Sequence, residues 1–108
     1  MITVQYSPKQ RKLRIKGHAG YKPPGEDIVC AAASMIFYNL AQVLMEYDKE
    51  QTRTKPVEMK YGDVSVIRAY PKAAVEAWVD HDFYFALTGF RLLENQYPEH
   101  VNVVITEK

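Results

Sequence analysis

The hydrophobic and polar positions at the start of this chain follow a period of two. Residues 1–6 alternate between apolar and polar side chains, and residues 11–16 alternate again. Such alternation is typical of strands that bury one face. The residues between them, Ser7-Pro8-Lys9-Gln10, have the side chains of a turn. This part of the chain therefore predicts a β-hairpin.

Two longer segments have the three- and four-residue spacing of amphipathic helices. The first runs from Asp27 to about Asp48, and the second from about Ala73 to Tyr97, with Trp78 widening its apolar face. The positions expected to face inward on the first helix are Val29, Ala33, Ile36, Leu40, Val43, Leu44 and Tyr47.

Alternation returns between the helices and after them. Residues 57–61 and 64–69 flank the Gly62-Asp63 turn and predict a second hairpin, and residues 101–105 predict a final strand. The resulting order, ββαββαβ, indicates an α+β fold with a mostly antiparallel sheet and two helices packed on one face. We expect residues 1–108 to form a single domain.

The charge balance argues against one class of function. The net charge is only +1, whereas a dedicated nucleic-acid-binding domain is strongly basic, so we expect no direct nucleic-acid partner. The outer face of the first hairpin is basic and is compatible with contact to ribosomal RNA or an acidic substrate. We favour a solvated strand face whose lysines discourage edge-to-edge pairing.

The chain has one cysteine, which rules out an intramolecular disulfide and a cysteine-based zinc cluster. We therefore expect no metal and no cofactor. A free thiol favours a reducing compartment, so we expect a cytoplasmic location. No stretch approaches the roughly 18 apolar residues of a membrane span, and the start lacks the order of a signal peptide. A membrane is not expected as a partner.

The candidate chemistry lies between the first hairpin and the first helix. Cys30 falls in the predicted first turn, where unpaired N–H groups and the helix dipole favour a thiolate. Asp27 is predicted to cap this helix by accepting from N–H groups two or three residues on; orienting His18 is the less favoured alternative. Glycines in the loop after His18 let the chain fold back, so a Cys/His pair is geometrically reasonable.

The residue pattern alone favours a plainer interpretation, in which Cys30 is a small buried hydrophobe and His18 a solvated loop residue. Ser34 lies four residues after Cys30 and is its neighbour on the helix. Its hydroxyl either bonds near the thiolate or bonds back to the carbonyl of Cys30. The triplet 80–82, Asp-His-Asp, is interpreted as a solvated face, because adjacent helix residues point in different directions.

The segment from Gly17 to Ser34 resembles the signature of a known family. It is similar to the pattern of the ribosomal-processing cysteine proteases, the Prp family. The matching residues are Gly-His-Ala, a short glycine-bearing loop, and then Gly-x-Asp-Ile-Val-Cys-Ala-Ala-x-Ser. Weaker matches extend the resemblance along the whole chain, at Gly62-Asp63, Gly89-Phe90 and Tyr97-Pro98-Glu99.

The resemblance implies a small homodimeric cysteine protease that acts on a protein substrate. In some bacteria the family removes an N-terminal extension from a large-subunit ribosomal protein, the one numbered twenty-seven, and cuts just after an aromatic residue. Phage-encoded relatives are associated with processing of capsid or scaffold proteins. The residues that match the family pattern are His18 as base, Cys30 as nucleophile, and Asp27, Ser34, Gly17 and Gly25 in supporting positions.

The expected mechanism follows from these roles. His18 takes the proton of Cys30, the thiolate attacks the scissile carbonyl, and N–H groups around Val29 and Cys30 stabilise the oxyanion. Residues 19–26 are expected to act as a lid that orders on substrate binding. Two other function classes stay open: a non-catalytic interaction module, in which Cys30→Ala leaves biological activity intact, and a thiol enzyme that does not cleave peptides.

Overall fold

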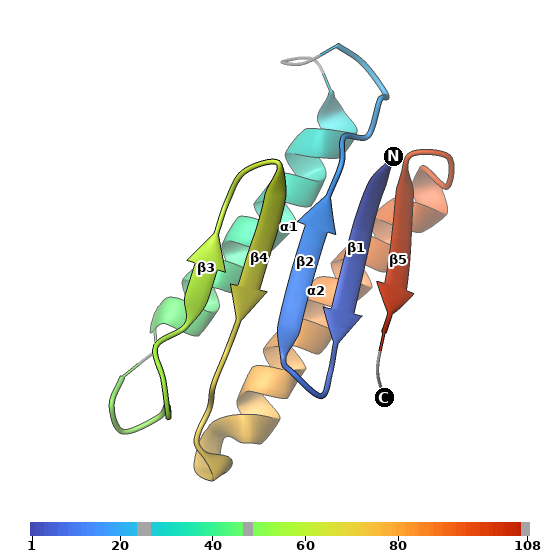
Figure 1. The fold of residues 1–108 in the computed structure, drawn as a ribbon. Coiled ribbons are helices and arrows are strands. Elements are labelled where there is room, and N and C mark those ends of the chain that lie inside the picture. Colours follow the sequence, from blue (N-terminus) through green and yellow to red (C-terminus); the bar gives the residue numbers. More distant parts are fainter. Residues whose placement is uncertain (24–26, 47–48, 107–108) are drawn as a thin grey trace.

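The computed structural model describes residues 1–23, 27–46 and 49–106 (Figure 1). The predicted ββαββαβ order and the α+β class are confirmed, and a short 3-10 turn, η1, precedes the second helix. The elements are β1 (Ile2–Ser7), β2 (Lys12–Lys16), α1 (Ile28–Glu46), β3 (Glu58–Lys60), β4 (Val64–Arg68), η1 (Ala73–Val75), α2 (Glu76–Gln96) and β5 (Val101–Ile105).

The strands form one sheet in the order β3-β4-β2-β1-β5, and both helices cover the same face, behind the strands in Figure 1. The pairs β1–β2, β2–β4 and β3–β4 are antiparallel, whereas β1 and β5 are parallel. A parallel partner requires the chain to return along the sheet before it enters the strand, and α2 provides that return.

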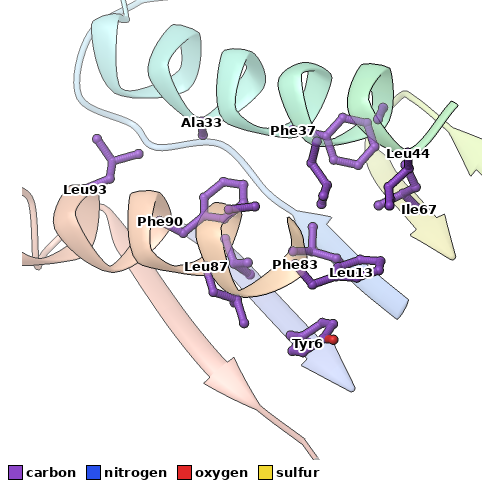
Figure 2. Close-up of a cluster of buried hydrophobic side chains, with 14 of the residues drawn as sticks. Tyr6, Leu13, Ala33, Phe37, Leu44, Ile67, Phe83, Leu87, Phe90 and Leu93 are labelled. Atoms are coloured by element: carbon purple, nitrogen blue, oxygen red, sulfur yellow. The ribbon is translucent and has the colours of Figure 1, made fainter. Parts of the chain in front are cut away.

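The core lies between the sheet and the two helices (Figure 2). Tyr6 and Leu13 point from the first hairpin toward α2, where the ring of Phe83 stacks on that of Tyr6 with centroids 5.1 Å apart. Burial disfavours the charged phenolate and, with the nearby carboxylate of Asp80, raises the pKa of Tyr6 to about 12. The first hairpin is thereby fixed against α2.

The buried face of α1 is rotated from the predicted one, because the helix packs against both the sheet and α2. Its buried residues are Val29, Ala33, Phe37, Leu40, Ala41 and Leu44. Phe37 and Ala41 therefore point inward, whereas Ile36 and Val43 line a groove between the helices. Tyr47, the last predicted inward position, lies outside the described residues.

α1 is more apolar than predicted. An 18-residue window of this helix has a mean hydropathy of 1.8, enough by length and composition to cross a membrane. The prediction that no stretch approaches such a span was wrong, because Glu46 is the only charged residue of the helix. Core helices of soluble proteins pass the same test, and α1 packs against α2 and the sheet.

The predicted inner position of Trp78 was also wrong, since its side chain is 67% exposed. Val79, the next residue along α2, is buried. One residue along a helix corresponds to about 100°, which here turns Trp78 away from the core while Val79 faces it.

Candidate active site

One end of the sheet brings together the segments that carry the candidate chemistry. The end of β2, the start of α1 and the turn before β5 meet at the upper end of Figure 1. Cys30 lies there in the first turn of α1, half-buried and packed against the core.

Asp27 caps α1 as predicted. Its Oδ1 accepts hydrogen bonds from the N–H groups of Val29 at 3.0 Å and Cys30 at 2.9 Å. These two groups have no partner inside the helix, so the carboxylate fixes where α1 begins.

The second carboxylate oxygen of Asp27 holds the preceding loop. Oδ2 accepts from the N–H groups of Tyr21 at 3.0 Å and Lys22 at 3.4 Å. Partial burial acts to raise the pKa of Asp27, but the N–H donors of Cys30, Lys22 and Tyr21 outweigh it and lower that pKa. Both oxygens are engaged with the backbone, which supports capping rather than orientation of His18.

We expect Asp27→Ala to lower the free energy of unfolding by about 1 kcal/mol at neutral pH, because it removes the helix cap. The lowered pKa means that Asp27 stabilises the fold above its unfolded-state pKa and loses this effect as pH falls through the folded-state pKa. The difference between wild type and variant should therefore shrink in acid.

Urea unfolding, followed from about pH 7 down to about pH 3, checks this pH dependence. The exposed Glu50 provides a control, because Glu50→Ala should leave the curve nearly unchanged. A stability difference for Asp27→Ala that stays constant with pH would contradict the assigned role of the carboxylate.

The thiol of Cys30 faces the same loop. Its Sγ accepts a hydrogen bond from the N–H of Ala19 at 3.3 Å. A donor aimed at sulfur stabilises negative charge there, and the thiolate is the nucleophilic form of cysteine. The predicted oxyanion donors need correction, because the N–H groups of Val29 and Cys30 are occupied by Asp27. The N–H of Ala19 is a donor already aimed at the sulfur.

His18 and Cys30 line one cavity of about 160 Å³, with Ser34 and Tyr61 among its other walls. The side chain of His18 is exposed, and no hydrogen bond between it and Cys30 occurs in residues 1–23, 27–46 and 49–106. Contacts of a general base often tighten only when substrate is bound. The structure therefore brings the two side chains to one cavity without a formed pair.

Ser34 takes neither of the two bonds considered from the sequence. Its Oγ lies 3.4 Å from the hydroxyl of Tyr61, and both residues line the cavity. Tyr61 also packs against Tyr38, with ring centroids 4.8 Å apart, and so adds an aromatic wall. The sequence placed Tyr61 at a strand end but carried no signal that it reaches the cavity.

Gly17 has a φ of +95°, which residues with a side chain rarely adopt. A Cβ at this position would also overlap the carbonyl oxygen of Met1. Glycine therefore lets the chain cross the start of β1 just before His18. Gly25, the other glycine in the predicted supporting set, lies outside the described residues.

His100, in the turn before β5, was not among the predicted site residues. Its Nδ1 lies 2.8 Å from the carbonyl oxygen of Ala19, and its ring meets that of Tyr21 edge-on. The only signal for this region in the residue pattern is the turn that starts at Tyr97-Pro98, which does not indicate a contact with a distant loop.

The arrangement suits nucleophilic catalysis. A cysteine at a helix start, a backbone donor on its sulfur and a histidine on the same cavity are the groups that acyl transfer to a thiol requires. In the part of the chain that the structure describes, no three His, Cys, Asp or Glu side chains are grouped to hold a metal ion.

Comparison with known proteins gives one family and several similar structures. The family model described as cysteine protease Prp matches residues 1–102. The structure of the essential ribosomal processing protease Prp from S. aureus with a covalently linked product peptide is similar, at a TM-score of 0.80 and 20% identity, over 98% of this chain and 100% of that one.

A second structure of the S. aureus protease, with a substrate peptide, has a TM-score of 0.70 and 21% identity, with 100% of both chains covered. SMU.848 from Streptococcus mutans has a TM-score of 0.67 and 24% identity, over 99% of this chain and 93% of that one. At such identities these likenesses show the fold. No curated protein matches the chain.

Proposed function

Since the chain belongs to the Prp family of cysteine proteases, we propose that it removes an N-terminal extension from a bacterial large-subunit ribosomal protein. Cys30 is the proposed nucleophile and His18 the proposed general base. The observation that carries this proposal is that both side chains line the cavity at the start of α1. With such a substrate the enzyme acts in the cytoplasm.

The proposed reaction uses these groups in two steps. His18 accepts the proton of Cys30, and the sulfur attacks the carbonyl carbon of the scissile bond. The negative charge moves to the carbonyl oxygen. As the sulfur loses its charge, the N–H of Ala19 is freed from it and donates to this oxygen instead. His18 gives its proton to the leaving amine, the C–N bond breaks, and water then hydrolyses the thioester.

The walls of the cavity fit the substrate implied by the family. Ile15 and Tyr61 are among its lining residues and offer apolar and aromatic contacts close to Cys30. An aromatic side chain just before the scissile bond would gain from burial against them. The S. aureus protease, which has a similar fold, forms a complex with a substrate peptide.

The test uses a synthetic peptide that spans the extension and the first residues of ribosomal protein twenty-seven. We expect a single cut after the aromatic residue, identified by mass spectrometry. A matched peptide with alanine at that position should be cleaved roughly 10- to 100-fold more slowly, since the apolar contacts are lost.

The outcomes separate the alternatives. Cleavage of a phage capsid or scaffold precursor, but not of the ribosomal peptide, would favour a phage-associated protease on the same fold. Rapid alkylation of Cys30 without any peptide cleavage would favour another thiol enzyme. A slow thiol and no cleavage would favour a non-catalytic interaction module.

We further propose that the chain forms a homodimer through the outer surface of its helices. A groove of about 460 Å³ between α1 and α2 is lined mainly by apolar side chains, including Met35 and Phe85, and Phe85 is 69% exposed. Exposed apolar surface of this kind marks an interface. Light scattering should give twice the 12.5 kDa mass of one chain, and a monomer would contradict the proposal.

One carboxylate beside this groove departs from the solvated face predicted for residues 80–82. Oδ2 of Asp82 is buried and has no hydrogen-bond partner among the described residues. Burial raises the pKa of Asp82, because it disfavours the charged carboxylate.

A further inference from the structure

His100 reaches across 81 residues of sequence to the loop that carries His18. Its Nδ1 lies 2.8 Å from the carbonyl oxygen of Ala19. A carbonyl oxygen can only accept a hydrogen bond, so Nδ1 carries the proton and donates it. The imidazole therefore holds the backbone of this loop.

Ala19 is held from both sides. Its N–H donates to the sulfur of Cys30 at 3.3 Å, while its carbonyl accepts from His100. The residue is only 2% exposed, so water does not compete strongly for either bond. The N–H of Ala19 shares one peptide plane with the carbonyl of His18. A restraint on Ala19 therefore also limits the position of His18.

His100 is itself fixed. Its N–H donates to the carbonyl of Tyr97 at 2.9 Å, and its own carbonyl accepts from the N–H of Ile2 at 2.9 Å. Its ring packs edge-on against Tyr21 at 5.4 Å, and Tyr21 meets Tyr97 at 5.3 Å. Nδ1 of His100 therefore belongs to a turn that is held by the sheet and by an aromatic cluster.

We propose that His100 is a positioning residue for the protease reaction. By holding the carbonyl of Ala19, it aims the N–H of Ala19 at the reacting sulfur and fixes the backbone on which His18 stands. This inference rests on the proposed roles of Cys30 and His18. His100 gives up no proton during the reaction; it donates the same hydrogen bond throughout.

Three variants test the geometry of this bond. Asparagine places an amide nitrogen at the position of Nδ1, glutamine places it near that of Nε2, and alanine removes the donor. His100→Asn should therefore keep the bond to Ala19, whereas His100→Gln and His100→Ala should lose it. The other titratable side chains around Cys30, namely His18, Asp27, Tyr61 and Asp63, stay unchanged in all three.

The measurement is the rate of alkylation of Cys30 by iodoacetamide as a function of pH, together with kcat and KM for the ribosomal peptide. His100→Ala and His100→Gln should react about 10-fold more slowly at neutral pH, with the profile shifted upward by about one pH unit. Their kcat should fall by a similar factor with little change in KM. His100→Asn should restore most of both.

The results separate this inference from the proposed function. If wild-type Cys30 is activated and all three variants match it, the positioning role is overturned and the proposed function stands. If the three variants lose rate equally, in proportion to a lower Tm, His100 only stabilises the fold and the inference is overturned. If wild-type Cys30 reacts as an ordinary thiol and cleaves no peptide, both proposals fall.

Discussion

Replacement of Cys30 by alanine is expected to abolish peptide cleavage while the protein stays folded. Removal of the nucleophile from enzymes of this type lowers the rate by about 10⁴-fold or more, because the remaining groups cannot form the covalent intermediate. The side chain is half-buried at the edge of the core, so the loss of one sulfur should change stability by only about 1 kcal/mol.

Initial rates on the ribosomal peptide and thermal unfolding of the same samples check this prediction. Thr88, exposed on α2, offers a control, since Thr88→Ala should keep both the rate and the fold. Cys30→Ser is informative as well, because its hydroxyl can still accept from Ala19 but is a much weaker nucleophile. Cleavage by Cys30→Ala at the wild-type rate would refute the proposed role of the thiol.

Replacement of Gly17 by alanine is expected to damage both the fold and the site. Its φ of +95° strains any residue with a side chain, and a Cβ would overlap the carbonyl oxygen of Met1 at the start of β1. Strain and overlap together should cost about 3 kcal/mol or more. The backbone can relieve the overlap only by moving away from β1, which displaces His18.

Two other glycines separate the contributions. Gly20 has a φ of +68° but open space around it, so Gly20→Ala should show strain alone, at about 1 kcal/mol. Gly62 has open space and an ordinary φ, so Gly62→Ala should change stability by less than about 0.5 kcal/mol. Urea unfolding should rank the three variants in this order. Cleavage rates should separate Gly17→Ala from Gly20→Ala only, because Gly62 itself lines the cavity. Equal losses for Gly17→Ala and Gly20→Ala would show that the overlap with Met1 does not matter.

The first hairpin and the start of α1 could be predicted from local sequence patterns. The alternation in the first hairpin, and the capping side chain of Asp27 before an apolar periodic segment, specify elements through neighbours in sequence. The face of α1 was predicted less well, because the helix packs against two partners. Phe37 is buried, and periodicity alone cannot tell which part of a wide apolar surface faces each partner.

The parts of the site that depend on distant segments were not predictable. Tyr61 meets Ser34 across 27 residues of sequence, and His100 meets Ala19 across 81. Neither contact leaves a periodic signal, because periodicity shows which face of an element is apolar and not which distant residue lies against it. The expected oxyanion donors were the N–H groups of Val29 and Cys30. The sequence did not show that the carboxylate of Asp27 occupies both of them while it also binds the loop.

The parallel pairing of β1 with β5 bears on how the enzyme matures. Ile2 lies opposite Val101, and its N–H is bound by the turn that presents His100. During synthesis the first hairpin and α1 emerge from the ribosome well before β5. If His100 positions the site, the nascent chain then carries its thiol and histidine without the restraint that aligns them. Full activity would arrive late, with the docking of β5, so a newly made molecule would cleave about 10-fold more slowly until its sheet is complete.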